Sequence, residues 1–220
     1  MKYLICLFCI FSLNTFHAQV KTPQPSPSAT INQVVGLTQF EIKYSRPSSR
    51  ERDVFGNLVP YDKLWRTGAN ANTTITFDED IVFGGQPVKA GTYALFTKPG
   101  QEEWDVYLYG KVDNWGAPQN WDKELIVAQT KASSEEISEY VESFTIDFNH
   151  FTKNTAHLIL KWENTMVKIP IEVPTDETVM NSIKMAINGP KSADYYNAAV
   201  YFLETDRDIK KAKMWIDEAM

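Results

Sequence analysis

The sequence has only two cysteines, Cys6 and Cys9, and both lie among the first ten of 220 residues. If this N-terminal segment is removed, as argued below, the mature chain has no disulfide, no thiol nucleophile and no thiolate metal ligand. The fold must then be held by core packing. A chain of this length with 43% hydrophobic residues can bury a sizeable core.

The sequence also lacks a basic run. It contains 22 Lys and Arg against 28 Asp and Glu, which gives a formal net charge of −6. Nucleic-acid-binding proteins usually concentrate positive charge on one face, so we expect no nucleic-acid partner. The sequence has no Gly-x-Ser-x-Gly elbow, no phosphate-binding glycine loop and no recognisable set of metal ligands. We therefore expect no metal and no cofactor, and favour a binding protein over an enzyme.

The N-terminal segment has the pattern of a secretion signal. Lys2 precedes an apolar run, Tyr3–Leu13, and Asn14–Ala18 is more polar. The run is too short to cross a hydrocarbon layer of about 30 Å as a helix. The order of positive charge, apolar run and small residue predicts a signal peptide over residues 1–18, cleaved after Ala18. We expect export to the periplasm or the extracellular space, with no transmembrane span in the mature chain.

Residues 19–28 are rich in Pro and Ser and predict an extended, mobile spacer. From Ala29 onwards apolar and polar residues alternate, as in half-buried strands. Further strands are expected at Thr38–Tyr44, Thr73–Phe77, Asp80–Phe83, Thr92–Thr97, Trp104–Tyr109, Leu125–Gln129, Phe144–Phe148, Ala156–Trp162 and Val167–Val173. Short strands separated by turn signals predict a mainly β fold, an antiparallel β-sandwich or barrel, over residues 29–174. One short helix is expected at Ser133–Glu142, because Ser134 is followed by two glutamates.

Residues 175–220 predict a short α-helical C-terminal segment. Helices are expected at Thr175–Ile187, Ala193–Glu204 and Asp208–Met220. Their small and large apolar residues fit a generic helical hairpin, and also fit the packing positions of a single tetratricopeptide-like unit. One such pair cannot bury its apolar face alone, so we expect the hairpin to dock on the β domain or to be part of a truncated array.

Arginine is concentrated in Tyr44–Asn70, which has four arginines and neither a helical nor a strand period. Five short motifs stand out in and after this segment: Tyr44-Ser45-Arg46-Pro47, Phe55-Gly56, Val59-Pro60-Tyr61, Trp65-Arg66-Thr67-Gly68-Ala69-Asn70 and Ala90-Gly91-Thr92-Tyr93. Together they resemble the signature of the domain of unknown function 2911 family over about Pro27–Val173. Ser48–Arg52 departs from the Gly-Arg run usual in that family. The resemblance implies a secreted bacterial protein with a β-rich core, and it implies no known activity.

A loop rich in guanidinium groups either holds a fold together or offers donors to an anionic ligand. In the second interpretation Arg46, Arg66 and Asn70 bind a polar or anionic group, and Trp65 or Trp115 stacks on the ligand. In the first, Arg66 pairs with Asp53 or Asp62, and Trp65 plugs the end of the sandwich. For Trp65 and Arg66 we favour the first interpretation.

The other candidate residues give weaker signals. His150 and His157 lie seven residues apart with no third ligand nearby, and we interpret them as surface or hydrogen-bonded histidines. The leading hypothesis for function is thus a secreted binding or interaction module whose partner is a polar or anionic ligand or a protein. The alternatives are a cell-envelope hydrolase that uses the Arg/Asn loop as an anion clamp, and a scaffold with no small-molecule site.

Overall fold

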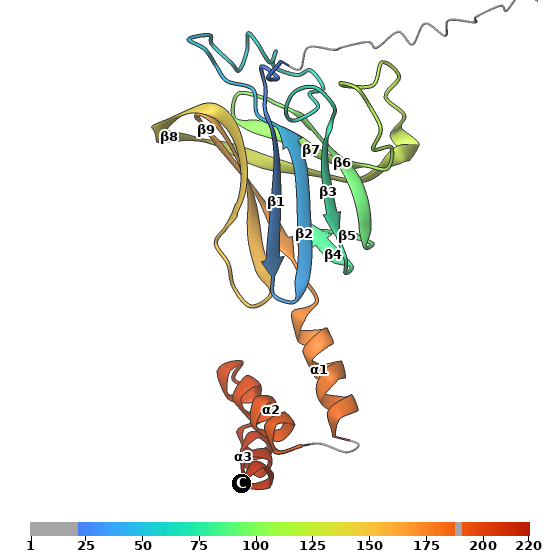
Figure 1. Cartoon of the computed structure of the whole chain (residues 1–220), viewed down its shortest axis with the longest axis vertical. Helices are drawn as coiled ribbons and strands as arrows, with labels where there is room; N and C mark the ends of the chain where they lie inside the picture. Colours follow the sequence, from blue (N-terminus) through green and yellow to red (C-terminus); the bar gives the residue numbers. More distant parts are fainter. Residues whose placement is uncertain (1–21, 188–190) are drawn as a thin grey trace, which may run out of the picture.

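A computed structural model describes residues 22–187 and 191–220. The expected signal peptide, residues 1–18, lies outside the described residues. The structure is mainly antiparallel β with three helices at the C-terminal end, which confirms the predicted fold class (Figure 1). The strands are β1 (Ser28–Val35), β2 (Thr38–Ser45), β3 (Thr73–Phe77), β4 (Ile81–Phe83), β5 (Gln86–Val88), β6 (Gly91–Lys98), β7 (Glu103–Tyr109), β8 (Ile126–Asn149) and β9 (Thr155–Glu172).

The nine strands form one sheet in the order β1-β2-β3-β6-β7-β8-β9-β4-β5. Each neighbouring pair of strands is antiparallel. The burial pattern of β2 shows why its sequence forms a strand. Phe40, Ile42 and Tyr44 are buried on one face, whereas Gln39 and Lys43 are exposed on the other. This alternation places one side of the strand against the core and leaves the other in water.

The sheet bends at β8, so that its two halves face each other. The first part of β8 pairs with β7 up to Ser133, and the part from Ser134 pairs with β9. Aromatic rings of β2 and of the second part of β8 meet in the core, with centroids 5.3 Å apart for Phe40 and Phe148 and 6.0 Å apart for Tyr44 and Phe144. The result is sandwich-like packing within one open sheet whose edges are β1 and β5.

The predicted helix at Ser133–Glu142 was wrong. These residues belong to β8, and Ser134, Glu135 and Glu136 pair with residues of β9. The local helix-start signal is overridden because this backbone is hydrogen-bonded across a long hairpin. The same hairpin merges pairs of predicted strands. Leu125–Gln129, apart from Leu125, and Phe144–Phe148 fall at the two ends of β8, and Ala156–Trp162 and Val167–Val173, apart from Val173, fall in β9.

The tight turn between β4 and β5 depends on glycine. Gly84 and Gly85 have φ of +55° and +84°, as the two central residues of a two-residue hairpin require. A Cβ on Gly84 would lie 2.4 Å from the Cβ of Thr130, and the Thr130 hydroxyl donates to the Gly84 carbonyl over 3.0 Å. The turn therefore packs directly on β8.

The helices are α1 (Thr175–Ala186), α2 (Ser192–Glu204) and α3 (Ile209–Ala219), close to the predicted ranges. They extend from the end of the sheet that carries the β1–β2 turn (Figure 1). Their own apolar cluster includes Ile183, Phe202 and Trp215, and the last two rings pack edge to face with centroids 4.8 Å apart. An ion pair between Lys153 Nζ and Glu204 Oε2, 2.9 Å long, links α2 to the β8–β9 turn.

Candidate functional site

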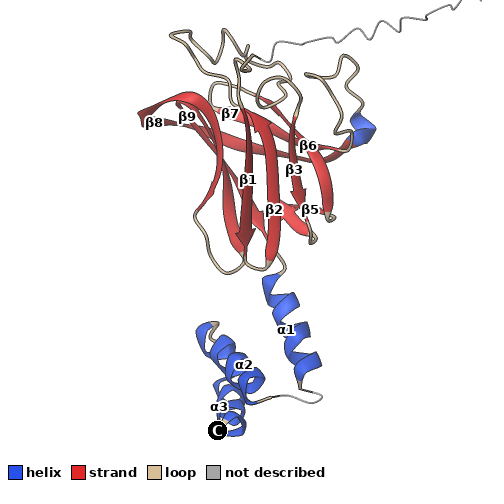
Figure 2. Ribbon diagram, viewed as in Figure 1, coloured by secondary structure: helices blue, strands red, loops and turns tan. Residues whose placement is uncertain are grey.

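The arginine-rich segment forms loops at the end of the sheet opposite the helices (Figure 2). Five of the eight non-glycine residues with positive φ among the described residues lie in this segment, and they are Arg50, Glu51, Asp62, Thr67 and Asn70. Each such residue costs of order 1–3 kcal/mol and persists only where surrounding contacts hold it. Strained backbone is found at functional sites more often than elsewhere. This end of the sheet is therefore the first candidate for a binding site.

Trp65 anchors the segment in the core. Its ring is 9% exposed and packs against the rings of Phe144 and Trp162, with centroids 4.9 Å and 5.8 Å away. Its backbone N–H donates to the carbonyl of Thr97 on β6 over 2.7 Å, and its indole N–H donates to the carbonyl of Gly68 over 3.0 Å. This is the packing that the structural interpretation of Trp65 predicted, because the ring fills the end of the sandwich and is not open to a ligand.

The turn after Trp65 is held on both sides. Thr67 is fully buried at φ +54°, an unusual backbone conformation for a β-branched residue. Its hydroxyl donates to Thr97 Oγ1 over 3.1 Å, and its carbonyl accepts from the Thr73 hydroxyl over 2.5 Å. Asn70 donates through Nδ2 to the carbonyl of Ser26 and to Ser45 Oγ, each over 3.2 Å. These contacts fix the backbone on either side of Arg66.

Three of the four arginines bind the protein itself. Arg46 donates to the Phe144 carbonyl over 3.1 Å and to Thr145 Oγ1 over 2.7 Å. Arg50 donates to the Pro25 carbonyl, and Arg52 donates to the carbonyls of Ser48 and Ser49, all over 2.8–2.9 Å. The Arg50 side chain, the Asn70 amide and the Arg46 backbone N–H bond to the carbonyls of Pro25, Ser26 and Pro27, and so attach the end of the predicted Pro/Ser spacer to the sheet.

Arg66 is the exception. Its Nε is buried and has no hydrogen-bond partner, and none of the ion pairs found among the described residues involves it. The predicted pairing with Asp53 or Asp62 is therefore not seen. Burial lowers the pKa of Arg66, and no carboxylate opposes that shift. The guanidinium is partly desolvated and lacks a counter-ion from the described chain.

The loop between β7 and β8 brings a second candidate residue to Arg66. A Cβ on Gly116 would lie 3.5 Å from Arg66 Nη1, so the loop backbone passes close to the guanidinium. Bonds between Asn72 and Asn114, of 2.9 and 3.1 Å, hold this loop in place. Trp115, next to Gly116, is 82% exposed. The structure thus brings the backbone beside Trp115 close to Arg66, while Arg46 and Asn70 are occupied by internal hydrogen bonds.

Trp121, a second tryptophan of the loop between β7 and β8, packs on the outer face of β6 and β7. Its ring stacks on Tyr109 with centroids 4.4 Å apart, and it also contacts Phe96 and Tyr107. The sequence did not distinguish Trp115 from Trp121, since both follow turn-forming residues. Gly116 was also missed as a neighbour of Arg66, and only its φ of +94° and its place in the folded loop reveal that role.

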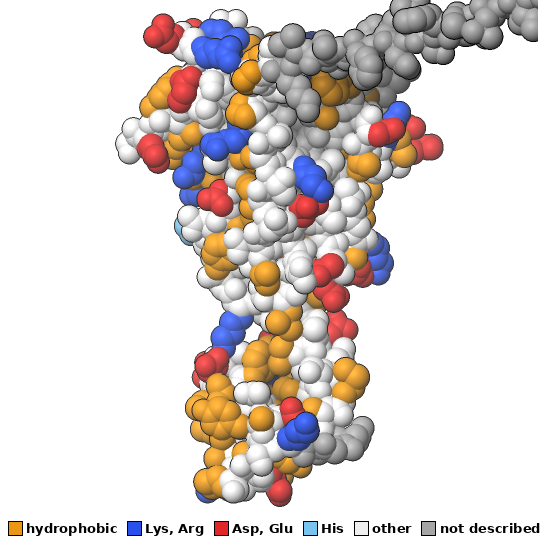
Figure 3. Space-filling model, viewed as in Figure 1, with side chains coloured by type: hydrophobic (Ala, Val, Ile, Leu, Met, Phe, Trp, Pro, Cys, Tyr) orange, Lys and Arg blue, Asp and Glu red, His pale blue; other side chains and the backbone are white. Residues whose placement is uncertain are grey.

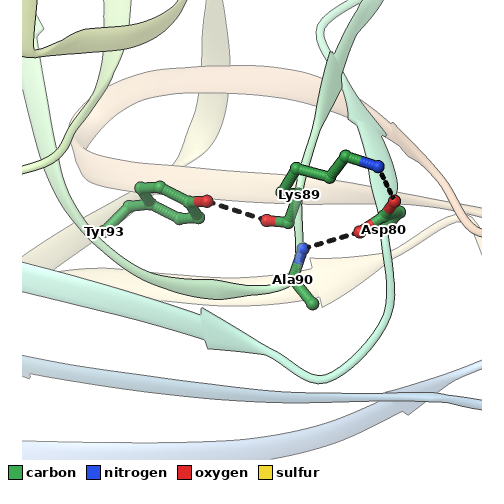
Figure 4. A network of polar contacts seen from close by, with 4 residues as sticks. All are labelled: Asp80, Lys89, Ala90 and Tyr93. Atoms are coloured by element: carbon green, nitrogen blue, oxygen red, sulfur yellow. Dashed lines mark hydrogen bonds and ion pairs between the residues drawn. The ribbon is translucent and has the colours of Figure 1, made fainter.

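A cavity of about 450 Å³ lies elsewhere, between the β4–β5 hairpin and the start of α1. Its polar lining includes Asp80, Lys89, Glu172 and Glu177. Asp80 accepts from Lys89 Nζ over 2.6 Å and from the Ala90 N–H over 2.9 Å, as Figure 4 shows. The hydrogen bond from Lys89 is the main reason for the lowered pKa of Asp80.

The polar groups beside this cavity serve the hairpin. In Figure 4 the Tyr93 hydroxyl points back to the Lys89 carbonyl, to which it donates over 2.8 Å. Asp80 and Lys89 likewise satisfy each other and the turn backbone, so this network explains the local fold without a ligand.

Hydrophobic side chains also gather over the helices (Figure 3). An apolar groove of about 230 Å³ runs between α2 and α3 and is lined by Val200, Leu203, Ile209 and Ile216, among others. Any helical hairpin with one unpaired face leaves such a groove. It therefore does not separate the tetratricopeptide-like interpretation from the generic hairpin.

The histidines do not form a metal centre. The rings of His150 and His157 lie 5.1 Å apart at the β8–β9 turn, and burial lowers the pKa of His157. Within residues 22–187 and 191–220, no group of three or more His, Cys, Asp or Glu side chains is placed to hold a metal ion. In the same ranges, no helix is long and apolar enough to cross a membrane.

Fold and site together define a β-rich protein with a rigid, arginine-bearing loop region at one end of a folded sheet. A family model described as "Protein of unknown function (DUF2911)" matches residues 26–171, and the chain belongs to this family. This confirms the resemblance seen in the sequence. No curated protein and no solved structure matched the chain.

Proposed function

We propose that this protein is an exported binding module that holds an anionic group on Arg66, with Trp115 offering a surface for the rest of the ligand. The observation that carries the proposal is the guanidinium of Arg66, which is partly desolvated, has a buried and unpartnered Nε and makes no ion pair within the described chain. The other arginines of the segment are occupied by internal acceptors.

The physical argument rests on the cost of an unpaired charge. Removing a cation from water without a partner is unfavourable, so partly buried charges are normally paired. Arginine presents a planar fork of donors that matches a carboxylate, sulfate or phosphate. An anion at Arg66 would supply the missing partner. The turn need not reorganise to receive it, because Trp65 and Thr67 already fix the backbone on both sides.

Trp115 narrows the class of ligand. It is the one tryptophan of the six whose ring is mostly exposed, and it adjoins Gly116, whose backbone lies close to Arg66 Nη1. Aromatic rings at the surface stack well on sugar rings and other flat apolar faces. A ring that carries an acidic group, such as a uronate or a sulfated or phosphorylated sugar, satisfies both residues at once.

The test compares the denaturant midpoints of the wild type, Arg66→Met and Lys63→Met with and without sulfate or glucuronate. Sodium chloride is added to keep the ionic strength constant. Arg66→Met removes the charge and keeps the stem, and Lys63→Met removes an exposed charge from the same segment. At ten times the Kd, a bound anion adds about 1.4 kcal/mol to the free energy of unfolding.

We expect this stabilisation in the wild type and in Lys63→Met, and not in Arg66→Met. A fourth protein, Trp115→Ala, is expected to keep the effect of sulfate and to lose part of the effect of glucuronate. Equal stabilisation of the wild type and Arg66→Met, or no effect of either anion on the wild type, would remove Arg66 as the binding group.

A further inference from the structure

The two free edges of the sheet differ in how they are protected. β5 has three residues, and Pro87 at its centre has no N–H to offer. β1 has eight residues, Ser28–Val35, with no proline and no charged side chain, and it pairs with β2 without a bulge. Proteins usually shield edge strands with proline, charge, bulges or short length. β1 has none of these features.

The register shows which backbone groups of β1 face outwards. The Arg46 N–H donates to the Pro27 carbonyl over 2.8 Å, so residues 27 and 46 form a hydrogen-bonded pair. Such pairs alternate along an antiparallel ladder, so the odd-numbered residues of β1 bond to β2. The N–H and C=O groups that point away from β2 belong to Ser28, Thr30, Asn32 and Val34. Within residues 22–187 and 191–220, no strand pairs with this side of β1.

We infer that the β1 edges of two copies of this chain pair antiparallel about a two-fold axis at Ile31, so that the sheet continues from one copy into the other. The four outward residues are spaced symmetrically about Ile31. In this register Ser28 lies opposite Val34 of the second copy, and Thr30 lies opposite its Asn32. All four residues then become hydrogen-bonded pairs. Only the Val34 carbonyl has another partner, the Gln33 amide 2.8 Å away, and that exposed side chain is free to move.

The side chains of β1 are also compatible with a two-fold axis at Ile31. The odd-numbered residues lie on the core side of β1, where Ala29 and Ile31 already pack against the core. In the paired sheet Ile31 meets its own copy in a non-hydrogen-bonded pair, the closest kind of cross-strand contact. On the outer face the strand exposes Ser28, Thr30, Asn32 and Val34, of which Val34 is 55% exposed. No like charges oppose each other across the axis.

A second copy is favoured over an extended segment of another protein because β1 carries no charge that a different partner would complement, and because pairing with itself brings two apolar Ile31 side chains together. Two-fold homodimers are also the commonest assemblies of soluble proteins. The three helices extend from one end of the sheet (Figure 1). The inference does not depend on an anion at Arg66, and the two tests below do not involve that residue.

The first test is the mass in solution, measured by sedimentation over a concentration series on protein recovered from a secreting host. We expect twice the mass of one chain at high concentration. Asn32→Pro removes one outward N–H that the fold itself does not use, so it should yield a monomer. Its unfolding midpoint should equal that of the wild type at concentrations low enough for the wild type to be monomeric. Asn32→Ala removes the same side chain, keeps the N–H and should remain a dimer. A wild type that is monomeric throughout, or a dimer that survives Asn32→Pro, would overturn the inference.

The second test fixes the register and does not require proline in the strand. The exported chain is expected to lack cysteine, so a single introduced thiol reports only on contact between copies. Ile31→Cys lies on the axis and should form an intermolecular disulfide under mild oxidation. Asn32→Cys faces Thr30 of the other copy and lies farther from its own counterpart, so it should cross-link much less. Cross-linking that is equal at both positions, or stronger at residue 32, would contradict the axis at Ile31.

Discussion

Trp65 stacks on Trp162, with ring centroids 5.8 Å apart and planes inclined by only 21°. This contact joins the arginine-rich segment to β9, two parts of the chain that are far apart in the sequence. Phe55 and Trp104 pack edge to face around the pair. The residue that follows Trp65 is Arg66, so the proposed binding group is attached directly to a residue that contacts four aromatic rings of the core.

Trp65→Ala should therefore lower the free energy of unfolding by about 3–5 kcal/mol, the usual range for deleting a large buried aromatic side chain. Trp65→Phe keeps most of the ring and loses the bond to the Gly68 carbonyl, so a smaller loss is expected. Chemical denaturation of both variants measures the difference. If Trp65→Ala cost less than about 1 kcal/mol, the ring would not be part of the core.

Thr67 allows a test of the strained turn. Thr67→Gly removes the cost of a β-branched residue at φ +54° and loses the hydroxyl contact with Thr97, two effects of about 1–2 kcal/mol that oppose each other. Thr67→Val keeps the strain and loses the same hydrogen bond. We expect Thr67→Val to be the less stable variant in equilibrium unfolding. The opposite order would mean that relief of the strain is smaller than the combined cost of the lost buried methyl group and the added entropy of glycine in the unfolded chain.

The start of α1 is linked to α2 through Asp176, which accepts a hydrogen bond from the Tyr201 hydroxyl and pairs with Arg207, 3.1 Å from Nη2 to Oδ2. The Tyr201 bond lowers the pKa of Asp176 below its ordinary value. A lowered carboxyl pKa gives stability that is present above the unfolded value and is lost as the pH falls through the folded one. Helical circular dichroism of the wild type should therefore decline in acid. In Tyr201→Phe this decline should be weaker, and an equal acid dependence would contradict the link.

The contact between Asp176 and Tyr201 also affects the titration of Tyr201 at alkaline pH. Burial and Asp176 raise the pKa of Tyr201 to about 12. Its neutral form is favoured in the folded state, so this stability is present below the ordinary tyrosine pKa of about 10 and is lost as the pH rises towards 12. Difference absorbance between the wild type and Tyr201→Phe should show one phenolate that forms near pH 12. A difference signal centred near pH 10 would show that the hydroxyl is not held by Asp176.

The N-terminal segment gives a prediction about processing. Expression in a secreting host should yield a mature chain that begins near Gln19, because the apolar run Tyr3–Leu13 is followed by a small residue at Ala18. Intact-mass spectrometry of the exported protein measures this directly. Recovery of exported protein that retains residues 1–18 would show that the segment is not a cleaved signal.

Much of the fold could be read from local pattern. The ends of β3, Thr73 and Phe77, were predicted correctly, because five alternating residues lie between turns. All three helices were found close to their observed bounds, since their apolar residues recur with helical spacing. In these elements the local preference and the final environment agree.

The parts that local pattern did not reveal depend on contacts between distant segments. Ser133–Glu142 carries a helix-start signal, yet it is a strand because β9 is available to pair with it. The bend of β8 is not visible in its sequence. Local pattern also could not show that Arg46 is hydrogen-bonded within the protein whereas Arg66 Nε has no partner. The acceptors for Arg46 come from Phe144 and Thr145, about a hundred residues along the chain.

The bend of β8 also bears on how such a chain can be divided or recombined. β8 belongs to both halves of the sheet, and its partner β9 carries the pairing onward to β4 and β5. A break within this hairpin leaves each half with an exposed ladder and half a core, so neither piece is a viable folding unit. We therefore expect circular permutants and inserted domains to be accepted in the β1–β2 turn, where Leu37 is exposed, and rejected anywhere along Ile126–Glu172 except the β8–β9 turn.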